Sequence, residues 1–159
     1  MISSSLDMLE ESLVKKLEVM RKIMSENARQ KDILSDTDNV DFEVFDHTLD
    51  VKGEYIDQLL ALDDGFQTLF DKVKKDVEGR KEEFADQIKR MQALIHDIAD
   101  ASASIEAEEY RNKTLAEKYF STEREKMSSG KRSAAAAFNY YQTMSKSKDI
   151  PPQFLDKKN

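Results

Sequence analysis

A heptad repeat runs through the middle of this sequence, and no proline interrupts it. Apolar side chains recur at alternating steps of three and four, which places them on one face of a helix. They are Phe42, Phe45, Leu49, Ile56, Leu59, Phe66, Phe70, Val73 and Val77. Two further positions of the series are polar, Lys52 and Asp63. A helix of this extent would be more than about 50 Å long, so it must pair lengthwise with other helices.

Two other segments carry the same spacing. The first covers about residues 4–34 and the last about residues 81–127. The positions at this spacing form the buried face, or seam, of each helix. The apolar seam positions are Leu6, Leu9, Leu13, Leu17, Met20 and Met24 in the first segment, and Phe84, Ile88, Met91, Ile95, Ile98 and Ile105 in the last. Ser102 occupies one further seam position of the last segment. The polar stretch 35–39 predicts a loop. Gly79 predicts either a tight turn or a kink, and a kink would join the second and third segments into one very long helix.

The predicted fold is therefore all-α, an elongated antiparallel three-helix bundle or coiled coil. We place the bundle in residues 1–130, with helices over about 4–34, 41–78 and 81–127. Within residues 131–159 we predict a short alanine- and aromatic-rich helix. Ala134–Ala137 favours helix formation, and Pro151-Pro152 prevents the helix from continuing to the end of the chain. We expect this C-terminal region to be mobile when free.

Composition argues against catalysis and cofactor binding. The chain has no Cys and two His, so a disulfide framework, a thiolate zinc site and a thiol nucleophile are excluded. Neither His47 nor His96 has the Glu three residues earlier that di-iron bundles use. The stretch Asp36–Asp41 fails as a calcium loop because Asp41 stands where Gly is required. We expect no enzyme activity, no cofactor and no metal.

Charge and hydropathy bear on location and partners. Residues 1–16 lack the features of a secretory signal, and no apolar run is long enough to span a membrane, so we expect a cytoplasmic protein. Residues 1–110 carry a net charge of −13 and residues 111–159 a net of +6. An acidic body is unsuited to nucleic acid. The acidic body and basic tail suit a protein partner, or are simply solvated surface.

The C-terminal region concentrates large apolar side chains in a segment otherwise suited to disorder. Aromatic and methionine side chains adapt well to protein surfaces. We therefore predict partner binding by Phe138, Tyr140, Tyr141, Met144, Phe154 and Leu155. The alternative is that this segment folds back as a short fourth helix that caps the bundle.

Several stretches resemble FlgN-type flagellar export chaperones. The similar stretches are Lys52–Phe66, which ends in Leu-Asp-Asp-Gly-Phe, then Ile95–Ile98 with Ser102 and Ile105 after it, Asn112-Lys113, Tyr140–Met144 and Gln153–Lys158. The alanine run 134–137 is a departure, which leaves the register of the tail against the bundle open. The resemblance implies a small helical chaperone that binds the C-terminal helical segment of hook–filament junction proteins. It would prevent their premature assembly and deliver them to the membrane export gate.

Two alternatives stay open. One is a chaperone for another flagellar subunit, the filament cap or the filament. The other is a structural coiled coil, in which Lys52 and Asp63 would set the register between two chains. A spacer of that kind should be an obligate dimer, whereas we expect a chaperone to be a monomer or a weak homodimer.

Overall fold

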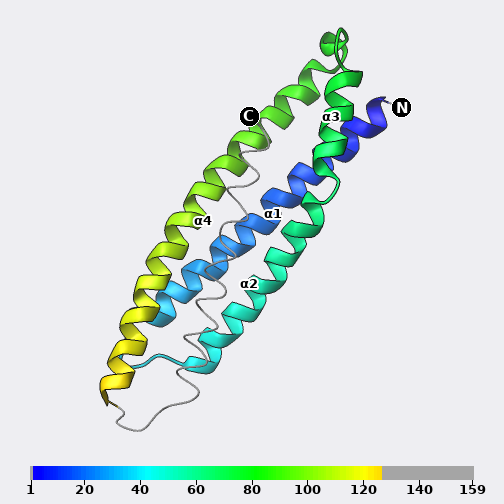
Figure 1. Cartoon of the computed structure of the whole chain (residues 1–159). Helices are drawn as coiled ribbons and strands as arrows, with labels where there is room; N and C mark the ends of the chain where they lie inside the picture. Colours follow the sequence, from blue (N-terminus) through cyan, green and yellow to red (C-terminus); the bar gives the residue numbers. More distant parts are fainter. Residues whose placement is uncertain (1, 127–159) are drawn as a thin grey trace.

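The structure is a computed structural model, and it describes residues 2–126. Within this range it consists of α1 (Ile2–Ser35), α2 (Phe42–Asp63), α3 (Phe66–Asp76), a 3₁₀ turn (Lys81–Phe84) and α4 (Ala85–Lys126), with no strand (Figure 1). The predicted all-α fold is confirmed. The predicted C-terminal helix and tail, residues 131–159, lie outside the described residues.

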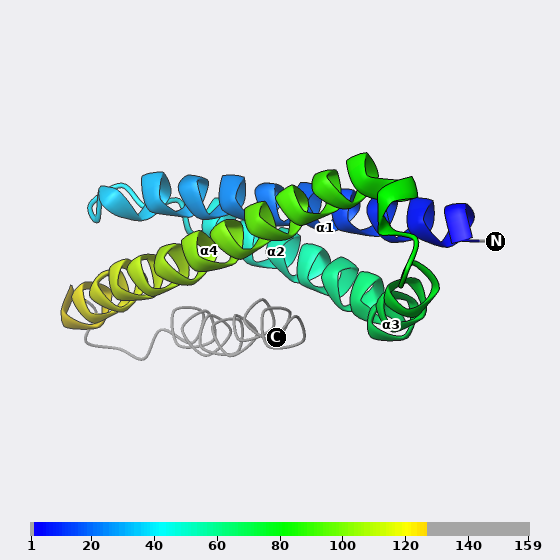
Figure 2. The ribbon, with the colours of Figure 1, turned by 90° about the horizontal axis from the view of Figure 1, so that it is seen from above.

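The helices form an elongated bundle in which α1 packs against α2, α3 and α4. Contacts between α1 and α2 run antiparallel, since Lys16 meets Asp63 and Gln30 meets Thr48. Contacts between α1 and α4 run parallel, since Glu10 pairs with Arg90 and, further along both helices, Asn27 meets Glu108. Consecutive long segments therefore run in opposite directions, as Figures 1 and 2 show, and the predicted antiparallel arrangement is confirmed.

One face of α1 forms the centre of the core. Its seam follows alternating steps of three and four for the whole helix, and no seam side chain is more than 2% exposed. The nine positions are Leu6, Leu9, Leu13, Lys16, Met20, Ile23, Asn27, Gln30 and Leu34. Three of the nine are polar, so the core of this bundle is not uniformly hydrophobic.

The prediction of one unbroken helix over residues 41–78 is wrong. The helix that begins at the N-cap Asp41 ends at Asp63, and a new one starts at Phe66. Asp64 is extended, and Gly65 has a φ of 78°, a left-handed conformation that glycine adopts without steric cost. Sequence periodicity missed the break because the steps of three and four pass through it unchanged, from Leu59 to Asp63 to Phe66.

Gly79 marks a turn and not a kink. Its φ is 81°, and the amide of Arg80 donates to the carbonyl of Val77 at 2.8 Å. Residues 81–84 then make one 3₁₀ turn before α4 starts. The turn reverses the chain, so α3 and the first part of α4 lie at the same end of the bundle (Figure 1).

Candidate functional site

A buried polar layer crosses the bundle between a large apolar cluster at the Gly79 end and a smaller one around Phe45 and Phe120. Its centre is Lys52 of α2, whose Nζ pairs with Glu109 of α4 and donates to Gln30 Oε1 of α1 at 3.2 Å. Gln30 Nε2 donates to Thr48 Oγ1 at 3.0 Å, and Asn112 Nδ2 donates to Gln30 Oε1 at 3.2 Å. All five side chains are buried. Burial lowers the pKa of Lys52, while Glu109 opposes that shift.

The layer continues toward solvent through α1 and α4. Asn27 Nδ2 donates to Glu108 Oε1 at 3.0 Å, and Asn112 Nδ2 donates to the main-chain carbonyl of Asn27 at 2.8 Å. Partial burial raises the pKa of Glu108, although Asn27 and Arg111 act in the opposite direction. Lys52, Gln30 and Glu109 come from the seams of their helices, whereas Thr48 and Glu108 each stand one position beside a seam residue.

We interpret this layer as structural. Buried polar groups satisfied in only one alignment are well suited to fixing helix register. Sequence reasoning identified Lys52 as a polar seam position but missed its partners. The signal was available, because Gln30 lies four residues before the apolar seam residue Leu34 and Glu109 lies four residues after Ile105. Spacing alone did not reveal that these polar positions meet in space.

A second polar pair supports the break between α2 and α3. The buried Lys16 places its Nζ 3.7 Å from Asp63 and 4.4 Å from the centre of the Phe66 ring. The cation therefore contacts the last residue of α2 and the first residue of α3. This accounts for Asp63, the other polar seam position, within a single chain.

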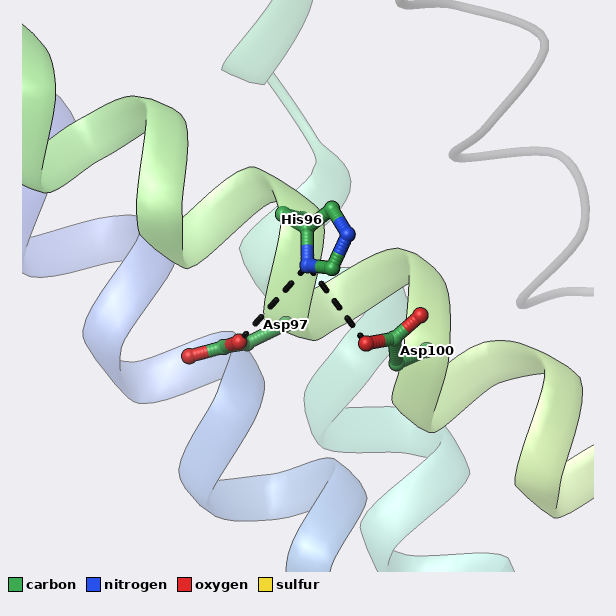
Figure 3. Close-up of side chains that lie close together, drawn as sticks. All are labelled: His96, Asp97 and Asp100. Atoms are coloured by element: carbon green, nitrogen blue, oxygen red, sulfur yellow. Dashed lines mark ion pairs between the residues drawn. The ribbon is translucent and has the colours of Figure 1, made fainter.

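His96, Asp97 and Asp100 gather on one face of α4 (Figure 3). His96 Nδ1 lies 3.4 Å from Asp100 and 4.0 Å from Asp97. The histidine side chain is 75% exposed, and both carboxylates are exposed. A trio from a single exposed helix face is surrounded by water, and no other described His, Asp or Glu completes it. We assign it no role.

An apolar groove lies at the end of the bundle that holds the Gly79 turn. It has a volume of about 350 Å³ and is formed by α1, α3, the 3₁₀ turn and α4. Its lining residues are Leu6, Leu9, Phe70, Val73, Lys74, Val77, Lys81, Ile88, Met91, Gln92 and Ile95. Most of them are seam residues, so the groove is an open stretch of the core.

The groove exists because α3 and α4 each pack on α1 rather than closely on one another. Figure 2 shows α3 and the first turns of α4 diverging around α1. Leu6 and Leu9 are buried, whereas Phe70, Ile88 and Ile95 are only half-buried. At the opposite end the aromatic rings of Phe45 and Phe120 meet edge to face, with centroids 6.3 Å apart, and both are buried.

The partner-binding residues predicted from the sequence lie outside the described residues. They are Phe138, Tyr140, Tyr141, Met144, Phe154 and Leu155. The repeat does not reveal the groove, because it indicates only which face of each helix is apolar. The half-burial of Ile88 and Ile95 depends on the divergence of two helices, which the repeat does not encode.

Comparisons with known proteins give no identification. No known protein family, no curated protein and no solved structure matches this chain. Among residues 2–126, no helix is long and apolar enough to cross a membrane.

Proposed function

We propose that this protein is a cytoplasmic, non-catalytic export chaperone that binds an amphipathic helix of a protein client. The observation that carries the proposal is the apolar groove between α3 and α4. Following the resemblance to FlgN-type chaperones, the client is the C-terminal helical segment of a hook–filament junction protein, which the chaperone delivers to the export gate. Binding masks the segment and prevents premature assembly.

The groove fits this task physically. Its walls run from Phe70 to Val77 and from Ile88 to Ile95, about 11 Å each at 1.5 Å per residue. A client helix would enter with apolar residues spaced as i, i+3 or i+4, and i+7. An unassembled subunit exposes such a face to solvent, where it promotes aggregation. Reversible burial in an open groove needs neither a nucleotide nor a covalent step.

The buried charges support binding rather than catalysis. Lys52 and Glu109 pair with each other, and Lys16 lies against Asp63. None of these four side chains lines the groove. Among the described residues, the groove wall therefore offers mainly apolar contact area, and these charged pairs lie away from it.

The same pairs weaken the structural coiled-coil alternative. Lys52 and Asp63 were the residues expected to set register between two chains, and both have partners within one chain. A chaperone for the filament cap or the filament remains the nearest alternative, because the groove fits any amphipathic helix. The identity of the client decides between them.

Titration calorimetry tests the proposal. The C-terminal segment of a hook–filament junction protein from the same genome is titrated into the full chain, into a chain ending at Gly130, and into Ile88→Gln/Ile95→Gln. A control, Val14→Gln/Leu60→Gln, removes two exposed apolar side chains away from the groove.

We expect one-to-one binding by the full chain and the control, and binding at least about tenfold weaker in the groove variant, because two half-buried contacts are lost. The chain ending at Gly130 lacks all six predicted tail residues, so the affinity that it loses measures their contribution. Absence of binding by the full chain would exclude this client. Equal binding by the groove variant and the control would exclude the groove.

A further inference from the structure

We propose that the groove selects helices whose apolar face is bordered by carboxylates, and that Lys74 and Lys81 bind those carboxylates. This inference rests on the proposed function and specifies its partner. The occupant is an amphipathic helix of another protein, acidic along the edges of its apolar face.

The charges that line the groove carry the inference. Of its lining residues, only Lys74 and Lys81 are charged, and both are exposed. Within residues 4–125, neither amine forms an ion pair with a carboxylate. The chain as a whole carries 32 Asp and Glu against 25 Lys and Arg. The two charged residues that line the groove are therefore both cations in a chain that is acidic overall, and Asp71 and Glu78 share a neighbouring hollow with them outside the groove.

The two lysines come from different elements, Lys74 from the last turn of α3 and Lys81 from the 3₁₀ turn. The Gly79 turn brings both to the groove. An apolar helix that enters here keeps its flanks near solvent, where carboxylates can meet the two amines. Such pairs contribute little individually at an exposed site, but they discriminate strongly against a partner of the wrong sign.

Charge also argues against the C-terminal region of this chain as the occupant. Residues 127–159 carry six Lys and Arg against two Asp, a net of +4. A segment of that charge would place cations beside Lys74 and Lys81. An acidic partner forms the complementary arrangement.

Two synthetic peptides test the inference with the full chain. They share one amphipathic helix of Leu and Phe, and the positions that border the apolar face are all Glu in one peptide and all Lys in the other. Fluorescence anisotropy measures both affinities for the wild type and for Lys74→Glu/Lys81→Glu. The control Lys75→Glu/Lys89→Glu changes two exposed lysines of neighbouring positions that do not line the groove.

We expect the Glu peptide to bind the wild type and the control at least about tenfold more tightly than the Lys peptide at low salt, because two favourable pairs replace two repulsions. The preference should reverse in Lys74→Glu/Lys81→Glu and shrink as salt screens the charges. Circular dichroism checks that each variant is folded.

Equal affinity for the two peptides, an unchanged preference in Lys74→Glu/Lys81→Glu, or no binding of either peptide would overturn the inference. Self-association of the chain that the groove variant Ile88→Gln/Ile95→Gln abolishes would overturn it too, by making a second copy the occupant. The proposed function fails separately, when the junction-protein segment does not bind.

Discussion

The polar layer makes a quantitative prediction about Lys52. The change Lys52→Met keeps the length and most of the volume of the side chain but removes its amine. Glu109 then stays buried without its cation, and Gln30 Oε1 loses one of its two donors, keeping Asn112. The cost of the substitution therefore comes mainly from a buried carboxylate that loses its cation and not from a cavity.

Breaking a buried ion pair by removing one partner costs about 3–5 kcal/mol. Domains of this kind are stable by about 5–15 kcal/mol in total. With a urea slope of about 2 kcal/mol/M, the unfolding midpoint of Lys52→Met should fall by about 2 M. Replacing both partners by apolar side chains is often close to neutral, so Lys52→Met/Glu109→Leu should regain most of the loss.

Urea unfolding followed by circular dichroism measures these stabilities, at 10 °C if the single variants are marginal at 25 °C. The matched control is Arg90→Met, which breaks the 2.9 Å pair with Glu10 on the surface, where the Arg90 side chain is 58% exposed. A pair of this kind contributes less than about 1 kcal/mol. The cycle of Lys52 and Glu109 variants should therefore show strong coupling that the surface pair lacks.

Additive effects of Lys52→Met and Glu109→Leu on the free energy of unfolding would contradict this explanation. If Lys52→Met/Glu109→Leu were as unstable as the sum of the two single variants, the pair would not be the source of the cost. A loss in Lys52→Met no larger than in Arg90→Met would show that the layer is hydrated and does not behave as a buried site.

Three further predictions concern the fold. Gly65→Ala should lower the free energy of unfolding, measured in urea, by about 1 kcal/mol, because φ is positive at this position. The added Cβ meets no atom within 4 Å, so a steric clash does not contribute. Gly65→Asn should lower the free energy of unfolding less, and equal losses would refute the backbone explanation. Burial raises the pKa of Glu108 above 4.5, so the native state binds more protons than the unfolded state between 4.5 and the folded pKa. The free energy of unfolding should fall as the pH rises through that window. The fall should be smaller in Glu108→Gln, whose side-chain carbonyl can still accept the hydrogen bond from Asn27. Identical pH profiles of stability for the wild type and this variant would contradict the prediction. Phe120→Ala should cost about 3–5 kcal/mol in the same assay, since the ring is buried, while the exposed Tyr110→Ala should stay within about 0.5 kcal/mol of wild type.

The residues that carry the family resemblance have structural positions where they fall among the described residues. Lys52 and Asn112 belong to the polar layer, and the Leu-Asp-Asp-Gly-Phe stretch forms the break between α2 and α3. These parts of the resemblance therefore reflect how a bundle is built.

Sequence by itself determined the class of fold and its repeat. Steps of three and four specify one buried face per helix, and that local geometry does not depend on the neighbours. The same rule identified Lys52 and Asp63 as exceptions, while the polar stretch 35–39 placed the first loop and Gly79 placed a break. It could not distinguish a turn from a kink, because both satisfy the same spacing on either side.

Tertiary structure alone decided which polar seam residues meet and where the core stays open. Lys52, Gln30 and Glu109 are distant in the sequence, and the antiparallel pairing of α1 with α2 together with the parallel course of α1 and α4 brings them to one level. The groove arises because α3 and α4 diverge around α1, leaving Ile88 and Ile95 half-covered. Periodicity records which face of a helix is apolar, but the distance between two helices depends on the packing of the whole bundle.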